Sequence, residues 1–310
     1  MSSQILTVAV LMCTYNGSKY LRKQLDSILN QTHKSWVIFV SDDGSTDDTV
    51  NILKEYQNKL GDEKFHILTG PGKGFSWNFL SLLESAGEEF FAYAFCDQDD
   101  IWKLNKLERS INWLCKQNAQ KPAMHCGRTE LIDEDDAAIG YSPLFVRLPS
   151  LRNALIQSIA GGNTMTLNHQ ARKLVIMTPR WIEIVSHDWW VYILLSSYNG
   201  IVHYDMTPTI DYRQHTNNIV GSNTGWLARI KRISGLMDGK FRDWIGKNIT
   251  ALQSLDVDLP KENAQLLKKF IEARDAPLMK RISLFRELKL YRQTHYGTIA
   301  FYIAVLLKKI

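Results

Sequence analysis

The run Asp97-Gln98-Asp99-Asp100 places three carboxylates within four residues, directly after the apolar residues 90–95. So many like charges at the end of a buried strand are costly unless a cation neutralises them. Carboxylate oxygens suit Mg²⁺ or Mn²⁺, which typically bind one or two carboxylates and complete their coordination with substrate phosphates. The cluster therefore predicts a site for a metal ion and a diphosphate, with an acidic turn that caps the next helix as the alternative.

A second acidic pair, Asp42-Asp43, follows the apolar residues 36–41 and precedes Gly44. A carboxylate at the tip of a strand can accept hydrogen bonds from a nucleotide base or ribose. Asp-Gly also favours a tight turn, and a turn that leads into a capped helix is the alternative interpretation.

The first apolar run, residues 6–13, is not followed by a glycine-rich phosphate-binding motif. Neither GxGxxG nor GxxxxGK[ST] is present, and the run continues into Thr14-Tyr15-Asn16 instead. Both the Rossmann dehydrogenases and the P-loop NTPases are therefore disfavoured, because their phosphate sites depend on those glycines.

The elements that must position these side chains alternate between apolar runs and amphipathic stretches through the first 130 residues. Residues 6–13, 36–41, 65–68 and 90–96 have the length and composition of strands, and helical spacing separates them. We predict β-α-β units in a mostly parallel sheet flanked by helices. The acidic runs then lie at the carboxyl ends of strands, where open α/β sheets bind ligands.

Beyond these units, Leu104, Leu107, Ile111 and Leu114 are spaced as one face of a helix. Residues 128–150 lose this periodicity and carry acidic residues and two prolines, which predicts a long loop or flap.

The composition is that of a folded globular protein, with 310 residues, 45% of them hydrophobic and 22% charged. Its four cysteines are scattered singly, as expected for reduced thiols of a cytoplasmic protein. The sequence shows no secretory signal, and its longest apolar stretch near the end, residues 298–307, is about half of the roughly 20 residues that span a bilayer. No transmembrane helix is predicted.

Together these motifs resemble the family 2 glycosyltransferases, and the resemblance covers roughly residues 5–220. It implies the α/β GT-A fold and an enzyme that transfers a sugar from a nucleotide-diphospho-sugar. The matching residues, in the family's order, are Thr14-Tyr15-Asn16, the run from Ser41 to Asp47, Asp97-Gln98-Asp99 as the Asp-x-Asp motif, and Asp188.

The same resemblance assigns roles to these residues. It implies that Asp43 contacts the nucleobase, that Asp97 faces the ribose or donor sugar, and that Asp99 binds Mn²⁺ or Mg²⁺ on the donor diphosphate. It also implies that Thr14, Tyr15, Asn16 and Asn78 lie in the donor pocket. For Asn78, the start of a helix is the alternative interpretation.

Asp188 matches the family's catalytic base and precedes an apolar segment, residues 189–198, that is predicted to be helical. A base there would accept a proton from the acceptor hydroxyl as its oxygen attacks the anomeric carbon, and partial desolvation would raise its pKa. A plain N-terminal helix cap is the alternative interpretation.

The run Asp211-Tyr212-Arg213-Gln214-His215 departs from the Gln-x-x-Arg-Trp sequence of processive synthases in this family. It resembles the bacterial rhamnosyltransferases of cell-wall and O-antigen polysaccharides. The resemblance implies an inverting transfer from dTDP-β-L-rhamnose to a lipid-linked saccharide acceptor. His215 could bind the metal and Arg213 could offset phosphate charge. A polar loop here, a UDP-hexose donor and a non-catalytic nucleotide-sugar-binding protein remain as alternatives.

The charge is divided unevenly along the chain. Residues 221–310 carry 17 Lys and Arg against 8 Asp and Glu, a net of +9, whereas residues 1–220 carry a net of −4. Basic and apolar residues interleave at helical spacing in residues 226–233 and 280–292, which is typical of helices that bind anionic membrane surfaces. A solvated helical bundle is the alternative, and no motif indicates nucleic acid.

The sequence therefore predicts two parts, a GT-A domain over residues 1–221 and a basic helical region over residues 222–310. We expect a cytoplasmic protein that is peripheral on the inner face of the cell membrane.

Overall fold

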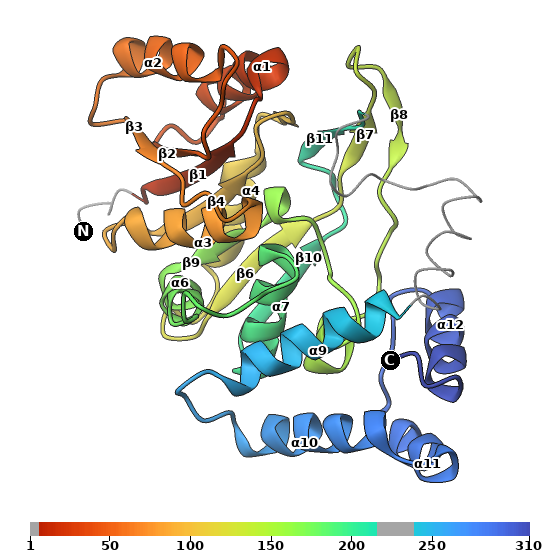
Figure 1. Cartoon of the computed structure of the whole chain (residues 1–310). Coiled ribbons are helices and arrows are strands. Elements are labelled where there is room, and N and C mark those ends of the chain that lie inside the picture. The colour runs from red at the N-terminus through yellow and green to blue at the C-terminus, as the bar shows by residue number, and fades with distance from the viewer. Residues whose placement is uncertain (1–5, 216–238) are drawn as a thin grey trace.

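The computed structural model describes residues 6–215 and 239–310 (Figure 1). A seven-stranded sheet in the order β10-β6-β9-β4-β1-β2-β3 forms its centre. Of these strands only β9 runs antiparallel to its neighbours, so the predicted, mostly parallel sheet is confirmed. The strands are β1 (Val8–Thr14), β2 (Trp36–Asp42), β3 (Phe65–Thr69), β4 (Ala92–Cys96), β6 (Ala123–Gly127), β9 (Thr166–Asn168) and β10 (Ile201–Asp205).

Helices cover both faces of this sheet, because successive side chains of a strand point to opposite sides. In β1, Val8, Val10 and Met12 pack on one face, and Ala9 and Leu11 pack on the other. The first face is covered by α1 (Ser18–Leu29), α2 (Thr49–Leu60) and α4 (Lys106–Leu114), and the second by α3 (Phe75–Ser85), α6 (His169–Ile176) and α7 (His187–Ser197).

The predicted start of α4 is wrong by two residues. Leu104 lies in the preceding loop and is 59% exposed, while the helix begins at Lys106. The Oε1 atom of Gln31 accepts a hydrogen bond from the Leu107 amide at 3.0 Å. A distant side chain thus helps to set the start of this helix, and the apolar spacing around it does not reveal that.

Over residues 128–150 a long loop or flap was predicted, and a loop without strands is wrong for the first half, where the chain forms a hairpin. Strands β7 (Glu130–Ile132) and β8 (Ala138–Tyr141) join β5 (Ile101–Trp102) and β11 (Ile210–Arg213) in a four-stranded sheet, order β5-β11-β7-β8. β7 pairs with β11, about 80 residues later in the chain. Strands β7 and β8 are short, and the position of β7 depends on pairing with the distant strand β11. The local sequence pattern therefore does not predict them.

The C-terminal part is helical, as predicted, and it packs on the sheet domain. It comprises α9 (Lys240–Gln253), α10 (Lys261–Asp275), α11 (Leu278–Leu288) and α12 (His295–Leu306), below the sheet in Figure 1. Phe241 of α9 stacks on Trp189 of α7 with ring centroids 6.3 Å apart, and both belong to one hydrophobic cluster. The predicted boundary at residue 222 and the segment 226–233 lie outside the described residues.

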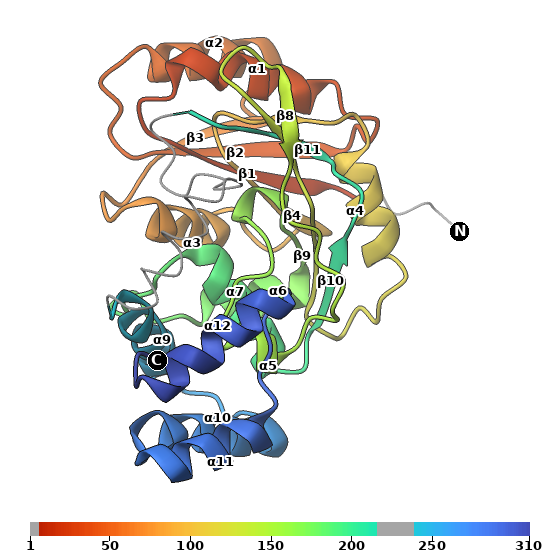
Figure 2. The same cartoon turned by 90° about the vertical axis from the view of Figure 1, so that its right-hand side faces the viewer.

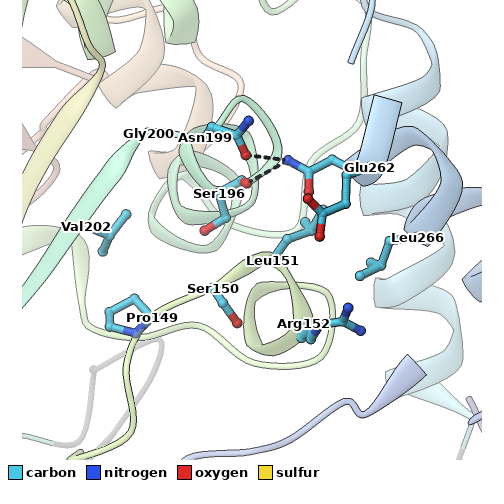
Figure 3. Close-up of a pocket in the computed structure, with 11 residues that line it drawn as sticks. Pro149, Ser150, Leu151, Arg152, Ser196, Asn199, Gly200, Val202, Glu262 and Leu266 are labelled. Atoms are coloured by element: carbon cyan, nitrogen blue, oxygen red, sulfur yellow. Dashed lines mark hydrogen bonds between the residues drawn. The ribbon is translucent and has the colours of Figure 1, made fainter. Parts of the chain in front are cut away.

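A pocket of about 370 Å³ lies where α10 meets the end of α7 (Figure 3). Asn263 crosses this junction, because its Nδ2 donates to the carbonyl of Ser197 at 2.7 Å and to Oδ1 of Asn199 at 2.9 Å. The pocket is therefore part of the contact between the two parts of the chain. No helix within the described residues is long and apolar enough to cross a membrane.

Candidate active site

Three carboxylates from two distant parts of the sequence converge at one end of the sheet. Asp97 and Asp99 follow β4, and Asp188 lies in the first turn of α7. Burial, followed by the negative charges of Asp99 and Asp188, raises the pKa of Asp97 to about 8. A shift of that size arises when like charges share a partly buried site, and a cation or a bound proton relieves it.

Asp99 and His215 form a pair at this edge, as the predicted metal ligands would. The Nε2 atom of His215 lies 2.7 Å from Oδ2 of Asp99, and both side chains retain some exposure. The ring of Tyr20 stacks on His215 at a centroid distance of 5.5 Å. Among the described residues, no three His, Cys, Asp or Glu side chains are grouped so as to hold a metal ion by themselves. The pair suits a cation that takes its remaining ligands from a diphosphate.

Asp100, the third carboxylate of the run, points away from this edge and is completely buried. It accepts hydrogen bonds from Nδ2 of Asn163 at 2.6 Å and from the Arg213 amide at 3.3 Å. Burial, together with the charges of Asp99 and Asp97, raises its pKa well above the ordinary value. Asp100 therefore belongs to the packing beneath the site.

Arg213 lies behind Asp99 and is also completely buried. Its Nε donates to the Asp99 carbonyl at 2.9 Å, its Nη1 donates to the Asp133 carbonyl at 3.0 Å, and it pairs with Asp136. Its guanidinium carbon is 4.3 Å from the centroid of the Tyr20 ring. The side chain thus ties the loop of Asp99 to the turn of the β7–β8 hairpin, while its contact with phosphate stays a prediction.

The loop after β1 is fixed to the loop after β4 by Gln98. Oε1 of Gln98 accepts from the Tyr15 amide at 2.9 Å, and its Nε2 donates to the Tyr15 carbonyl at 3.1 Å. A Cβ at Gly17 would lie 2.1 Å from Oε1 of Gln98, so this approach requires glycine. Tyr15 keeps an exposed ring at this edge.

Thr14 and Asn16 bind protein groups in the neighbouring loop after β2. Oγ1 of Thr14 donates to Oδ1 of Asp42 at 2.8 Å, and Thr14 is buried. Asn16 has a positive φ of 49°, and its Oδ1 accepts from the Thr46 amide at 2.8 Å. Asparagine tolerates this left-handed backbone better than most residues. Both side chains hold the shape of the loop.

Asp43 and Asn78 each form a hydrogen bond close to the end of β2. Oδ1 of Asp43 accepts from the Gly72 amide at 2.7 Å, and a Cβ at Gly70 would lie 2.5 Å from the same oxygen. Asn78 lies in the first turn of α3 (Phe75–Ser85), so this part of the chain is a helix start, which was the alternative interpretation. It is buried, and its Nδ2 donates to the Ser41 carbonyl at 3.2 Å. Its contact with a nucleotide stays a prediction.

Sequence reasoning gave no role to His187, which lies directly before Asp188. Its ring is buried and stacks on Phe79 at 4.2 Å, and neither ring nitrogen has a hydrogen-bond partner among the described residues. A Cβ at Gly162 would lie 2.0 Å from Nε2 of His187. Burial lowers the pKa of His187 to about 4, so the ring is neutral near pH 7.

Tyr212 is a second residue without a role in the sequence reasoning. Burial and the charges of Asp100, Asp97, Asp99 and Asp188 all raise the pKa of Tyr212. Its phenol therefore lies near every carboxylate of the site. The only sequence signal for it was its place between Asp211 and Arg213.

Carboxylates after β4 and at the start of α7, on a mostly parallel sheet, are the arrangement that the resemblance to GT-A glycosyltransferases implies. Residues 9–162 match the family described as Glycosyl transferase family 2. The dTDP-rhamnosyl transferase RfbG of Shigella flexneri is 31% identical over 274 residues, which cover 84% of this chain and 89% of RfbG. The chain therefore belongs to glycosyl transferase family 2.

Two further proteins extend the comparison. The UDP-Glc:alpha-D-GlcNAc-diphosphoundecaprenol beta-1,3-glucosyltransferase WfgD of Escherichia coli is 34% identical over 112 residues, 36% of this chain and 42% of WfgD. The crystal structure of S. aureus TarS 1-349 in complex with UDP-GlcNAc superposes with a TM-score of 0.56. It is 16% identical and the match covers 91% of this chain and 80% of that one, which shows a shared fold.

Proposed function

We propose that this glycosyltransferase moves L-rhamnose from dTDP-β-L-rhamnose to a lipid-linked saccharide, with inversion at the anomeric carbon. The observation that carries the proposal is the convergence of Asp97, Asp99 and Asp188, with His215 on Asp99. The rhamnosyl donor is supported by the similarity to RfbG over most of both chains. The lipid-linked acceptor is supported by the name of WfgD, whose acceptor is linked to diphosphoundecaprenol.

The proposed chemistry divides between the two ends of the donor. Asp188 accepts the proton of the acceptor hydroxyl while its oxygen forms a bond to the anomeric carbon. The bond from that carbon to the diphosphate breaks, and dTDP leaves with the electron pair. Attack from the side opposite the leaving group inverts the anomeric configuration.

Asp99 and His215 would hold the divalent cation, Mn²⁺ or Mg²⁺, at the diphosphate end. A bound cation supplies compensation for the charge that develops on the leaving diphosphate. Asp97 faces the ribose or donor sugar, and Asp43 faces the nucleobase. Thr14, Tyr15 and Asn16 shape the pocket through the loop contacts already described.

Asn78 and Arg213 support the pocket from behind in this proposal. Asn78 fixes the end of β2 just before Asp43, and Arg213 fixes the backbone of Asp99. Both are buried, so they act mainly through the residues that they hold.

A donor screen tests the proposed function. The full chain is assayed for transfer to an undecaprenyl-diphosphate-linked saccharide with dTDP-β-L-rhamnose, UDP-glucose and UDP-GlcNAc in Mn²⁺. We expect kcat/KM for the rhamnosyl donor to exceed the others by on the order of tenfold or more. Preference for a UDP-hexose would establish the alternative donor. Nucleotide-sugar binding without any turnover would establish the non-catalytic alternative.

Metal dependence is tested on the same assay with excess chelator and with Asp99→Asn. Both should reduce turnover by on the order of 10² or more, because the diphosphate charge loses its compensation. Asp62→Asn, an exposed carboxylate after α2, is the matched control and should retain activity. Full turnover of the wild type in chelator would remove the metal from the proposal.

A further inference from the structure

Helix α12 exposes apolar side chains along one side. Tyr296 is 87% exposed, Ile299 is 58% exposed and Ile303 is about half exposed, and the helix contains no charged residue. Exposed apolar residues are common singly, but a continuous stripe marks an interaction site. The opposite side of α12 is buried through Phe301 and Val305, so the exposed stripe is not needed to hold the helix in place.

The extended segment before α5 (Leu151–Ala154) exposes apolar side chains as well. Leu144, Val146 and Leu148 all point to solvent, and Leu148 is 84% exposed. Phe145, between them, turns inward to the ring of Tyr204 at 5.5 Å. Arg147 is exposed as well, with its guanidinium over the ring of Tyr291, so most of this segment faces away from the sheet domain.

These two stretches lie next to one another. The Arg147 amide donates to Oε1 of Gln293 at 3.1 Å, and Nε2 of Gln293 donates to the Arg147 carbonyl at 3.0 Å. The Tyr291 hydroxyl donates to the Leu148 carbonyl. Gln293 lies two residues before α12, and Figure 2 shows α12 and β8, from which the extended segment descends, on the side toward the viewer. We call the exposed side chains of Leu144, Val146, Leu148, Tyr296, Ile299 and Ile303 the α12 face.

The part of the chain that contains α12 carries a positive net charge. Residues 277–310 contain seven Lys and Arg and a single acidic residue, Glu287, and Lys308 and Lys309 follow α12 directly. A second copy bound through this face would bring the same positive region against itself, because a two-fold contact is made by identical patches. An anionic bilayer offers the complementary pair, an apolar interior beneath a negative surface.

We propose that the α12 face inserts shallowly into an anionic lipid bilayer and that the surrounding Lys and Arg contact the lipid headgroups. This rests on the proposed function in so far as a lipid-linked acceptor is met at a bilayer. The apolar side chains, rather than the basic stripe of residues 280–292, then supply the insertion. Arg281 in that stripe is itself buried and donates to backbone carbonyls.

Vesicle sedimentation with the full chain tests this surface, using vesicles of phosphatidylglycerol mixed with phosphatidylcholine and vesicles of phosphatidylcholine alone. The double variant Ile299→Ser, Ile303→Ser should weaken partition to the mixed vesicles by on the order of tenfold or more, because two apolar side chains lose their burial. Val146→Ser with Leu148→Ser should do the same from the other stretch. Leu104→Ser, at 59% exposure in the loop before α4, is the matched control and should bind as the wild type does.

Three results of the vesicle and solution measurements overturn the inference. The wild type fails to bind mixed vesicles, both double variants bind them as well as the wild type, or the double variants alter only the oligomeric state. Amide hydrogen exchange of the wild type with mixed vesicles should slow in α12 and the extended segment, and slowing elsewhere alone would also overturn it.

Donor hydrolysis in vesicle-free solution separates this inference from the proposed function. It should be unchanged in both double variants. Vesicle binding through the α12 face without turnover of any nucleotide-sugar would contradict the proposed function alone. Turnover without vesicle binding would contradict the inference alone.

Discussion

The carboxylate edge and the α12 face are both unfavourable in the isolated chain, but for opposite reasons. At the edge, Asp97, Asp99 and Asp188 crowd negative charge into a partly buried place. On the α12 face, Tyr296 and Ile299 leave apolar surface in water. The first arrangement gains from a cation and the second from an apolar phase.

The two regions also differ in how they are held. The edge rests on a dense set of hydrogen bonds from distant loops, including those of Gln98 and Arg213. The α12 face consists of side-chain tips that contact little else. Substitutions at the edge should therefore affect chemistry and stability together, whereas substitutions on the α12 face should affect neither in solution.

The largest expected effect is on catalysis at Asp188. Asp188→Asn should lower kcat by on the order of 10²–10⁴, because the acceptor proton loses its base, while KM for the nucleotide-sugar changes little. Steady-state kinetics with the preferred donor measure both constants. A near-normal kcat would show that another residue is the base. The Ile299→Ser, Ile303→Ser variant on the α12 face is the control.

The next effect is on the pH dependence of stability. His187 has a pKa of about 4 in the folded chain and about 6.5 when unfolded, so below pH 6.5 the unfolded state takes up a proton that the folded state does not. Above pH 6.5 neither state binds this proton, so the free energy of unfolding is undiminished. As the pH falls from 6.5 to 4, proton binding to the unfolded state lowers the free energy of unfolding by about 3 kcal/mol.

Urea denaturation at pH 7 and pH 4.5 measures this contribution. His187→Phe, which keeps an aromatic ring but cannot titrate, should lose about 2–3 kcal/mol less stability than the wild type between these pH values. Ile299→Ser should keep the wild-type pH dependence, since it lies on the other region. Equal losses in the wild type and His187→Phe would show that His187 does not carry the effect.

A smaller effect is expected where Arg213 supports Asp99. Arg213→Lys keeps the charge but cannot reproduce the three-way contact of the guanidinium with Asp99, Asp133 and Asp136. Because Asp99 then loses its support, the Mn²⁺ affinity of the donor complex should fall on the order of tenfold, with kcat recovered in saturating Mn²⁺. Manganese titration of the initial rate measures it. Lys19→Gln, which removes an exposed ion pair to Glu134 in the same hairpin turn, should leave the affinity unchanged.

The smallest effect is expected on the α12 face itself. Ile299→Ser should change the free energy of unfolding in solution by no more than about 0.5 kcal/mol, because the side chain is mostly exposed already. Urea denaturation without lipid measures it. A loss of several kcal/mol would show that Ile299 is part of the packing, and the contrast between the two regions would fail.

The strands and acidic residues of the carboxylate edge could be predicted from sequence because its elements are local, while the roles of its residues stay predictions. The strands β1, β2, β3 and β4 can be recognised from their apolar runs, and the acidic run after β4 can be recognised from its three carboxylates. Parallel strands connected by helices place their carboxyl ends at one edge, so the location of Asp43 and Asp97 at the same edge follows from topology. The hairpin of β7 and β8 did not follow, because its strands are defined by pairing with β11.

By itself the sequence determined the first four strands of the central sheet, the acidic residues that follow them and the excess of positive charge near the C-terminus. Only the tertiary structure decided which way each side chain faces. Asp100 turns inward to Asn163 while Asp99 turns out to His215, although the two are neighbours in the chain. Likewise α12 is apolar along its whole length, yet within residues 6–215 and 239–310 only one of its sides is buried. The reason is that the direction and burial of a side chain depend on the residues that pack against it, and these residues are far away in the sequence.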